Sequence, residues 1–494
     1  MVTAAVVTSA VALIPLFYLG VRVSEAGWTQ IAGELFTRRT GVLATRSLAL
    51  AAVVTGACVV LGVATAFLVG RTDMPARRTF GVLAALPLAV PTYVAGFSWV
   101  STVDDFEGFW DAALVLILCS YPYVYLPAAA ALAGSDPAQE EVARSLGRGP
   151  WSTFVSVTLR QIRPAVAAGG LLVALYVLSD FGAVSIVRVD VFTRAIFTSM
   201  NLGFDRTGAL VLATVLVVLT VALLVGENMT RRRGARYARV GGGARRPHSI
   251  VHLGLWRFPA LLGLAGVGAL ALGVPAYSLV RWFGAGVSRP GSVGEVVAAA
   301  SNSLWAAALG ALLTLLLAFP VGLLGARSPG PIVTVLDRLA YLSHALPGLV
   351  IGLSLVFFGI RVVYPLYQTV WLLALAYAAL FLPLAVGAVS TAVAQSPPVL
   401  EEVARSLGTR PLQVLRRVTA PLAAPGIGAG AALVFLTCMK ELPASLLLRP
   451  TGFDTLATEL WTHTNTAEFA AAAPYAAVLV LIAALPTWWL TRYG

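Results

Sequence analysis

Long apolar runs, separated by short polar segments, follow one another along almost the whole chain. Each run has about 20 residues, the length of helix that crosses a hydrocarbon layer ~30 Å thick. None shows the strict apolar–polar alternation of a membrane barrel strand. The twelve runs cover residues 2–21, 47–70, 80–102, 113–133, 164–187, 207–227, 258–281, 300–324, 334–360, 365–392, 425–448 and 468–491. The pattern predicts an all-α integral membrane protein with about 12 transmembrane helices, the first a retained span and not a cleaved signal.

The composition excludes the other broad classes of protein. Of the 494 residues, 59% are apolar and only 11% are charged. Soluble domains carry about a quarter charged residues, and disordered chains have low hydrophobicity, so neither class fits. Cys58, Cys119 and Cys438 lie far apart inside apolar runs, without the spacing of a metal site or a disulfide framework. We expect them to be small packing residues.

The arginines are distributed unevenly between the two sides of the predicted membrane protein. Counting spans from a cytoplasmic N-terminus places 22 of the 33 arginines inside. This bias predicts that the N- and C-termini are both cytoplasmic. The basic segment 228–257 is then a cytoplasmic linker, with a topological role favoured over a lipid-binding one. The net charge of +12 therefore does not indicate nucleic-acid binding.

The chain repeats itself. The octapeptide Glu140–Gly147 recurs letter for letter as Glu401–Gly408, at an offset of 261 residues. Matches at this offset continue downstream, and matches at an offset of 256 occur upstream. They include Pro164/Pro425, Gly169/Gly430, Asp180/Glu441, Arg188/Arg449, Phe192/Phe453, Ser47/Ser303, Arg71/Arg327, Pro91/Pro347, Gly96/Gly352 and Pro127/Pro383. The chain is thus predicted to contain two repeats, 1–227 and 258–494. Because each has six spans, they should run parallel, related by an axis along the membrane normal, around a central path.

The repeated octapeptide lies on the predicted cytoplasmic side and has the chemistry of a short helix. Asp136 and Pro137 suit its start, as do Ser396 and Pro397 in the second copy. Gly147 suits the left-handed residue that ends it. We expect a helix of about 11 residues, ~16 Å long, with a small apolar face of Val142, Ala143, Leu146 and their counterparts. A plain interfacial helix is one interpretation; the identical polar residues of both copies favour docking helices for two equivalent partner subunits.

These loops resemble the EAA coupling loops of binding-protein-dependent ABC transporter permeases. The pattern here is Glu140-Glu141-Val142-Ala143…Gly147…Pro164, with Glu401-Glu402-Val403-Ala404…Gly408…Pro425 in the second copy. Valine replaces the alanine of a strict motif at the third position. The resemblance implies an ABC type I importer permease-like fold, in which each coupling helix seats in a cleft of a cytoplasmic ATPase. The residues that it assigns to coupling are Glu140, Glu141, Ala143, Arg144, Gly147, Glu401, Glu402, Ala404, Arg405 and Gly408.

The resemblance also implies partners and a location. The chain has no phosphate-binding loop ending in Lys-Ser or Lys-Thr, and its only lysine, Lys440, precedes Glu441. We therefore expect a non-enzymatic permease subunit without a cofactor of its own, and ATP and Mg²⁺ bound by two copies of a separate ATPase. A periplasmic or lipid-anchored substrate-binding protein would deliver the substrate. The expected location is the bacterial cytoplasmic membrane, among membrane lipid.

The segment from Met439 to Thr458 is similar to the fused ferric-iron permeases of this superfamily. Thiamine permeases look alike here, and phosphonate or polyamine permeases are more distant, so ferric iron is favoured and thiamine is the alternative. Ionisable residues at membrane depth are costly and usually face a cavity or a partner. Asp180, Lys440 and Glu441 are therefore candidates for the translocation path. A pairing of Lys440 with Glu441, or one through Arg449, that pins helices together is the other interpretation.

The remaining candidate chemistry is sparse. The four histidines, His248, His252, His344 and His463, do not cluster in the sequence, so no metal site is predicted. His463 could contact a docked binding protein together with Glu459, although a solvated loop is the simpler interpretation. Two other classes stay open: an ion-coupled secondary transporter, which needs ionisable residues at the membrane midplane, and a passive channel, which gives the repeated cytoplasmic loops no purpose.

Overall fold

The computed structural model of the chain describes residues 1–201, 203, 205–234, 250–284, 293–328, 330–343 and 346–493. Throughout these residues the regular structure is helical, apart from one isolated β-bridge between Thr72 and Val251. The predicted all-α membrane fold is confirmed. Most of the predicted linker, residues 235–249, lies outside the described residues, as do His248 and His344.

The first repeat contains the six expected spans together with several short helices. Its elements are α1 (Val2–Ala26), α2 (Trp28–Leu35), α3 (Arg38–Arg71), α4 (Arg77–Ala85), η1 (Leu86–Ala89), α5 (Thr92–Val100), α6 (Phe109–Ser120), α7 (Pro122–Ala133), α8 (Pro137–Ser145), α9 (Pro150–Thr153), the π-turn η2 (Phe154–Thr158), α10 (Leu159–Ser179), α11 (Gly182–Ile186), α12 (Phe192–Asn201) and α13 (Arg206–Gly234).

The second repeat follows the same order. Its elements are η4 (Gly254–Trp256), α14 (Arg257–Gly268), the π-turn η5 (Ala269–Gly273), α15 (Val274–Gly284), α16 (Val293–Arg327), α17 (Pro331–Leu342), α18 (Gly348–Arg361), η7 (Tyr364–Leu366), α19 (Val370–Gln395), α20 (Pro398–Ser406), α21 (Pro411–Val414), the π-turn η8 (Leu415–Thr419), α22 (Ala420–Met439), α23 (Pro443–Leu448), α24 (Leu456–Asn465) and α25 (Phe469–Tyr493).

The third span of each repeat is broken, which the apolar runs did not predict. Nine helices of the described part are long and apolar enough to cross a membrane, and a tenth span is the pair α4–η1 and α5, bent by 92°. The pair takes the place of the run 80–102, and α17 and α18 take the place of 334–360. Each second segment starts directly after a proline at a matching repeat position, Pro91 or Pro347. Proline has no N–H to donate and disfavours a helical residue before it.

The fifth span of each repeat lies closer to the coupling loop than predicted. The continuous helices cover Trp151–Ser179 and Pro411–Met439, whereas the apolar runs were read as 164–187 and 425–448. The chain leaves the helix at Asp180 and at Lys440, and then forms the short helices α11 and α23. Periodicity missed these turns because the residues on both sides of them are apolar.

Small residues let the helices of each repeat approach closely. In the first repeat α3, α7 and α10 pack together, and in the second α16, α19 and α22 do the same. A Cβ on Gly169 of α10 would lie 2.6 Å from the carbonyl oxygen of Tyr123, and one on Gly430 of α22 would lie 2.4 Å from the Cβ of Ala388. Both glycines occupy matching repeat positions, as expected of close helix contacts in a membrane.

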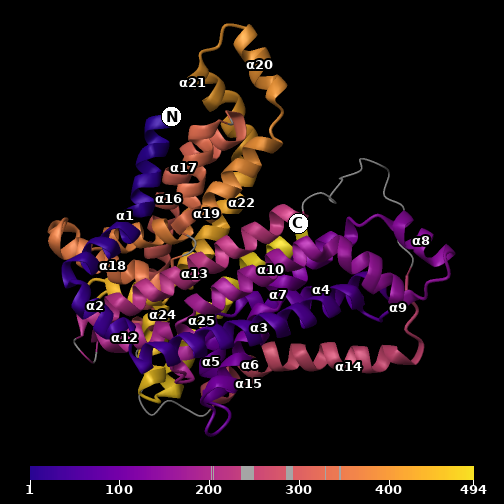
Figure 1. Cartoon of the computed structure of the whole chain (residues 1–494), viewed down its shortest axis with the longest axis horizontal. Helices are drawn as coiled ribbons and strands as arrows, with labels where there is room; N and C mark the ends of the chain where they lie inside the picture. The colour runs from indigo at the N-terminus through magenta and orange to yellow at the C-terminus, as the bar shows by residue number, and fades with distance from the viewer. Residues whose placement is uncertain are drawn as a thin grey trace.

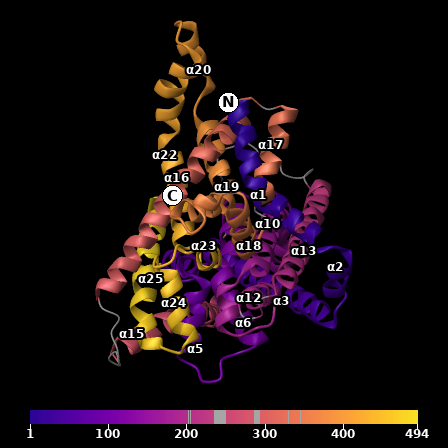
Figure 2. The same cartoon turned by 90° about the vertical axis from the view of Figure 1, so that its left-hand side faces the viewer.

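The first helix of each repeat packs against the other repeat. Helix α1 contacts α16, α17 and α18, whereas α14 and α15 contact α4 and α5 of the first repeat. Figure 1 shows the result: two arms of long helices diverge from a common body, one with α20 near its tip and the other with α8. Figure 2 shows the α20 arm from the side. At the opposite end α5, α11 and α24 pack together. The halves are therefore interlocked at the body and separate toward the coupling loops.

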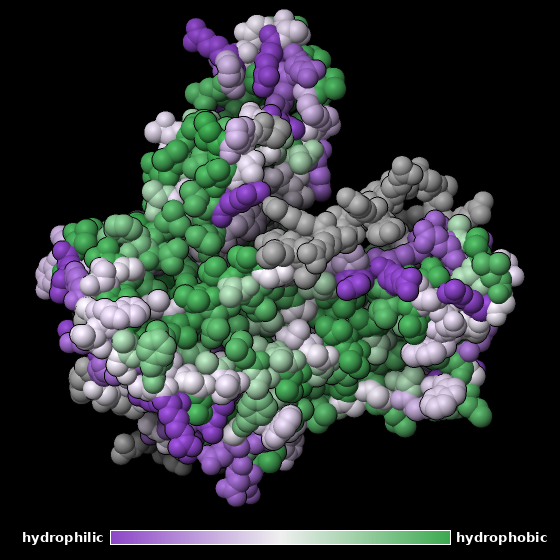
Figure 3. All heavy atoms as spheres, viewed as in Figure 1, coloured by the Kyte–Doolittle hydropathy of each residue, from purple (hydrophilic) through white to green (hydrophobic). Residues whose placement is uncertain are grey.

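The surface has the distribution expected of a membrane protein. Apolar residues cover the flank of the body and much of the upper arm in Figure 3, while polar residues gather near the arm tips and along the lower edge. Large side chains such as Leu262 of α14 and Leu316 of α16 are exposed, at 71% and 64%. Surface of this kind is stable against lipid and not against water.

Candidate coupling and translocation sites

Helices α8 and α20 contain the repeated octapeptide. Each has nine residues, two fewer than predicted. Helix α8 starts as predicted, because the Asp136 carboxylate accepts the N–H of Ala138 at 3.0 Å and a proline takes the first helical position. Helix α20 starts one residue later than predicted, after Pro397, and has no side-chain cap. A glycine with left-handed backbone follows the C-cap residue of each helix, as predicted: Gly147 (φ 82°) after α8 and Gly408 (φ 79°) after α20.

The first acid of the octapeptide points into the protein. Glu140 is only 7% exposed. Its Oε1 lies 3.1 Å from Nη2 of Arg71, the last residue of α3, and accepts the Thr158 hydroxyl at 2.9 Å. The same guanidinium also donates to the Leu132 carbonyl near the end of α7, at 3.3 Å. One buried ion pair thus fastens the coupling helix to α3, to α7 and to the π-turn η2.

The second repeat contains the same arrangement. Glu401 is 6% exposed. Arg327, the last residue of α16, donates from Nε to Glu401 Oε1 at 2.9 Å, and its Nη2 forms an ion pair with the same oxygen, also at 2.9 Å. The Thr419 hydroxyl donates to that oxygen at 2.9 Å. Arg327 Nη2 also donates to the Ser396 carbonyl at 2.8 Å. Both copies are therefore anchored by an arginine, a glutamate and a threonine, which we call the coupling anchor.

The assigned coupling residues consequently fall into two groups. Those that face inward are Glu140, Glu401 and Ala143, with Ala404 half-buried. Those that are exposed are Glu141, Arg144, Gly147, Glu402, Arg405 and Gly408. Of the predicted apolar face, Ala143 points inward, whereas Val142 and Leu146 are 58% and 76% exposed and their counterparts Val403 and Leu407 are 49% and 80% exposed. The exposed surface of α8 that a partner could cover therefore consists of Val142, Leu146, Glu141 and Arg144, and α20 presents the matching residues.

Sequence reasoning did not assign four residues of the coupling anchor to the site: Arg71, Arg327, Thr158 and Thr419. A signal was present. The two arginines match at the offset of 256, the two threonines match at 261, and each arginine ends an apolar run on the predicted inner side. Nothing in the sequence placed them beside a glutamate 69 or 74 residues away.

The end of the linker lies against the first coupling anchor. Residues 250–253, here called the linker strap, form the β-bridge: the N–H of Val251 donates to the Arg71 carbonyl at 2.8 Å, and that of Asp73 donates to the Val251 carbonyl at 3.3 Å. The Asp73 carboxylate accepts the N–H of Leu253 at 2.9 Å and lies 3.1 Å from Nδ1 of His252. These two hydrogen bonds, that from Leu253 above all, hold the pKa of Asp73 below its ordinary value. The strap therefore ties the second repeat to the end of α3.

The strap also lines a small cavity beside the anchor. The cavity has a volume of about 20 Å³ and is lined by Phe67, Arg71, Glu140, Arg144, Thr153, Phe154, Thr158 and Val251. Seven of these residues belong to the first repeat and one to the strap, so the linker is a structural part of the first coupling site.

Asp180 lies at the start of two helices. Its Oδ2 accepts the hydroxyl of Thr92, the first residue of α5, at 2.5 Å. Its Oδ1 accepts the N–H groups of Ala183 and Val184 in α11, at 3.0 and 3.3 Å. The side chain is 7% exposed. Helix N-termini favour a negative charge, so this carboxylate stabilises the second segment of the broken third span.

Glu441 has the same position in the second repeat. Its Oε1 accepts the N–H of Ala444 in α23 at 3.1 Å. A Cβ on Gly348, the first residue of α18, would lie 2.6 Å from that oxygen. Gly348 corresponds to Thr92 at the offset of 256. The longer glutamate thus faces a glycine where the shorter aspartate faces a threonine, and the two repeats fill the same space with different pairs.

Lys440 forms a contact between the repeats. Its Nζ donates to the carbonyl of Leu88, in η1 of the first repeat, at 3.0 Å. Within the described residues, no ion pair joins it to Glu441 or to Asp180, and Arg449 pairs with Asp454. Helix ends therefore hold the three candidate path residues: Asp180 contacts α5 and α11, Glu441 contacts α23, and Lys440 contacts η1.

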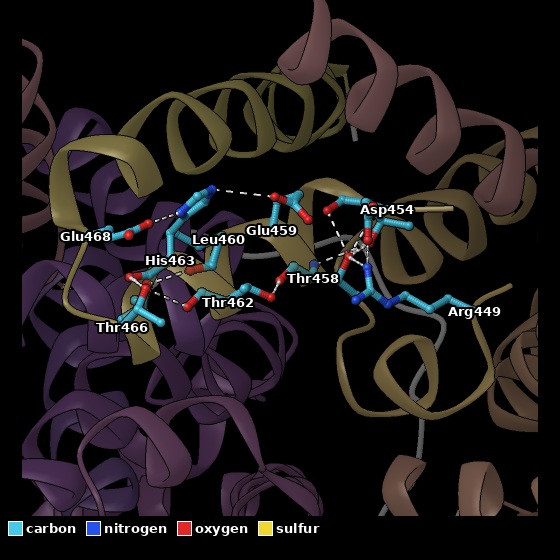
Figure 4. Close-up of polar contacts among 11 residues, drawn as sticks. Arg449, Asp454, Thr458, Glu459, Leu460, Thr462, His463, Thr466 and Glu468 are labelled. Carbon is cyan, nitrogen blue, oxygen red and sulfur yellow. Dashed lines mark hydrogen bonds and ion pairs between the residues drawn. The ribbon is translucent and has the colours of Figure 1, made fainter. Parts of the chain in front are cut away.

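A polar cluster surrounds α24 (Figure 4), which lies away from the coupling helices α8 and α20 in Figure 1. His463 of α24 lies between two acids, with Nδ1 2.7 Å from Glu468 Oε2 and Nε2 3.5 Å from Glu459 Oε2. Nearby, Arg449 donates to the Thr458 hydroxyl at 3.3 Å. Within the described part of the chain, no group of three or more His, Cys, Asp or Glu side chains is arranged to hold a metal ion. A contact of His463 and Glu459 with a binding protein stays a prediction.

Comparison with known proteins agrees with this architecture. Residues 58–229 and 318–493 each match the family described as binding-protein-dependent transport system inner membrane component. The chain is 37% identical over 484 residues to the "Fe(3+)-transport system permease protein FbpB 2" of Haemophilus influenzae, with 97% of this chain and 96% of that protein covered. It is 29% identical over 245 residues to the sulfate transport system permease protein CysT of Escherichia coli, with 45% and 88% covered.

The two family matches fall one in each repeat and include both coupling helices. They leave no support for an ion-coupled secondary transporter or a passive channel, which were the two other classes open from the sequence. The chain belongs to the family of binding-protein-dependent transport system inner membrane components, the permeases of ABC transporters.

Proposed function

We propose that this chain is the permease subunit of an ATP-driven importer, that its two halves rock around a central path by alternating access, and that α8 and α20 each dock one copy of a cytoplasmic ATPase. The observation that carries the proposal is the duplicated coupling anchor. In both repeats it buries one acid of the octapeptide and leaves two large apolar side chains exposed, Val142 and Leu146 or Val403 and Leu407. Exposed apolar side chains on a rigidly held polar helix are typical of a surface that a partner covers.

The proposal extends to topology and partners. Residues 1–227 and 258–494 would form the two halves, 228–257 the cytoplasmic linker, and both termini would be cytoplasmic, on the side of the coupling helices. ATP and Mg²⁺ would bind in the ATPase pair. A binding protein would dock on the opposite face, and we propose no contact with nucleic acid.

Ferric iron is the proposed substrate, because a relative that matches this chain over almost its full length bears the name of a ferric-iron permease. Thiamine is the alternative. We place the translocation path between the repeats, beside Asp180, Lys440 and Glu441, where the third spans break. Unwound helix segments at membrane depth are typical of transporter paths.

Docking is tested by cross-linking. In separate variants, Val142→Cys and Val403→Cys should each cross-link to the ATPase expressed with the chain, because both side chains are exposed on the coupling helices. Trp110→Cys is the matched control: Trp110 is 71% exposed near the start of α6, on the opposite side in the proposed topology. Cross-linking only from position 110, or from none of the three positions, would contradict the assignment.

The substrate is tested by uptake. In a strain that lacks other iron importers, deletion of this gene should abolish the uptake of radioactive ferric iron, and the intact gene should restore it. Retained iron uptake with lost thiamine uptake would replace ferric iron by the alternative. Genes for an ATPase and a secreted binding protein are expected beside this one.

A further inference from the structure

The break in the third span ends a helical segment, so that its last carbonyl groups need hydrogen-bond donors from elsewhere. Helix α4 continues as η1, which ends at Ala89, and the chain then turns by 92° into α5. The last carbonyls of a helix have no partner within it. In an apolar environment, each must find a donor elsewhere.

The donor for one of these carbonyls comes from the other repeat. Lys440 directly follows α22, and its Nζ donates to the Leu88 carbonyl at 3.0 Å. A cation at the C-terminal end of a helical segment is also favoured by the helix dipole. Lys440 is the only lysine among the 494 residues, so this contact is chemically distinct from the arginine pairs of the coupling anchors.

The contact has no counterpart in the first repeat. Residue 179, which corresponds to Lys440, is a serine whose hydroxyl donates to the Leu175 and Tyr176 carbonyls of its own helix at 2.9 and 3.0 Å. Glu441 does not compensate for the ammonium, because its carboxylate caps α23. Lys440 therefore reaches across the boundary between the repeats, and Ser179 does not.

The contact lies far from the coupling helices. Helix α22 starts at Ala420, close to α20, and Lys440 directly follows its last residue. Its 20 residues span about 30 Å. The arms diverge toward α8 and α20 (Figure 1), whereas α5, α11 and α24 near the break pack together. Lys440 thus joins the repeats at the end where they are closed.

From these observations we infer that Lys440 is a positioning residue that holds the broken third span against the second repeat while the coupling arms are apart, and that it releases Leu88 when the arms come together. The inference rests on the proposed function, in which the halves rock around a central path. A hydrogen bond of this length is lost once the separation grows by more than about 0.5 Å, so it cannot survive a rocking motion that parts these ends.

Release also has a chemical condition. An ammonium that loses its acceptor in an apolar environment must gain water or another oxygen ligand. The contact therefore breaks only when the passage beside it becomes hydrated. The Lys440 side chain thus links the separation of the repeats at their closed end to the entry of water there.

The first test measures the distance in two states. In a chain whose three native cysteines are replaced by alanine, Leu88→Cys and Lys440→Cys should be joined by a short bifunctional thiol reagent in the nucleotide-free complex, and at least fivefold less when the ATPases are trapped with ATP and vanadate. A reagent is used because a lysine that reaches a backbone carbonyl spans more than a direct disulfide can bridge. Tyr377→Cys with Ser445→Cys, treated with the same reagent, is the control, because that pair lies within one repeat, with its side-chain oxygens 2.7 Å apart, and its cross-linking should not change. Equal cross-linking of positions 88 and 440 in both states would overturn the inference.

The second test measures coupling. Lys440→Met should raise ATP hydrolysis in the absence of the binding protein several-fold and increase the ATP consumed for each substrate moved, because the closed end is no longer held. Lys440→Arg should restore the wild-type ratio, and Ser179→Ala should leave it unchanged. A fall in transport and hydrolysis at a constant ratio would indicate a purely structural role and refute the inference. Failure of the ATPase to associate at all would instead refute the proposed function.

Discussion

Removal of the arginine from one coupling anchor should release that coupling helix. In Arg327→Met, Glu401 would lose the hydrogen bond from Nε and the ion pair with the guanidinium. It would keep the hydrogen bond from Thr419 and the ion pair with Arg405 at 3.5 Å. Breaking a buried pair by removing one partner costs about 3–5 kcal/mol. Because the Arg327 side chain is 17% exposed, we take the lower end, about 3 kcal/mol. That cost raises the population in which α20 is detached by more than about a hundredfold.

The assay is amide hydrogen exchange of residues 398–406 in the purified permease. Arg327→Met should accelerate exchange of α20 and leave α8 unchanged, so the other repeat serves as an internal reference. The double variant Arg327→Met with Glu401→Leu should restore much of the protection, because it removes the unpaired buried charge as well. Glu402→Ala is the matched control, since Glu402 is exposed on the same helix. Unchanged exchange in Arg327→Met, or no recovery in the double variant, would refute the anchor.

Three further predictions concern the strap, the helix packing and the broken span. Asp73→Ala should accelerate hydrogen exchange of the backbone amides in the linker strap. Hydrogen bonding lowers the pKa of Asp73, so in the wild-type chain these amides should be protected at neutral pH. The protection should fade only as the pH falls through that lowered pKa. Gly169→Ala should lower the melting temperature, because its Cβ would lie 2.6 Å from a carbonyl oxygen, whereas Gly428→Ala should not, because nothing lies within 4 Å. Thr92→Val should cost about 1.5–3 kcal/mol in unfolding experiments, since Asp180 would lose a charged hydrogen bond.

The coupling helices show which features can be predicted from residues nearby in the chain. Asp136 and the glycines Gly147 and Gly408 act within a few residues of themselves, so their capping roles were predictable, as was the identity of the two loops. The orientation of Glu140 and Glu401 was not. A helix of nine residues has several faces, and the face that points inward depends on an arginine 69 or 74 residues upstream.

The broken third spans show the same limit at a larger scale. The run 80–102 is apolar enough to cross a membrane, and Pro91 alone does not decide between a kink and a turn of 92°. The turn is held by Asp180 at the start of α5 and by Lys440 at the end of η1. Asp180 and Lys440 are 88 and 352 residues away in the chain from the groups that they contact, Thr92 and Leu88.

By itself the sequence determined the membrane class, the two parallel repeats and the place of the coupling helices, because each follows from local hydrophobicity, from helix capping or from identity between copies. Only the tertiary structure decided which acid is buried, which arginine holds it, where the linker lies and which half Lys440 contacts. Those depend on the packing of distant helices, and a pattern along the chain contains no information on the distance between them.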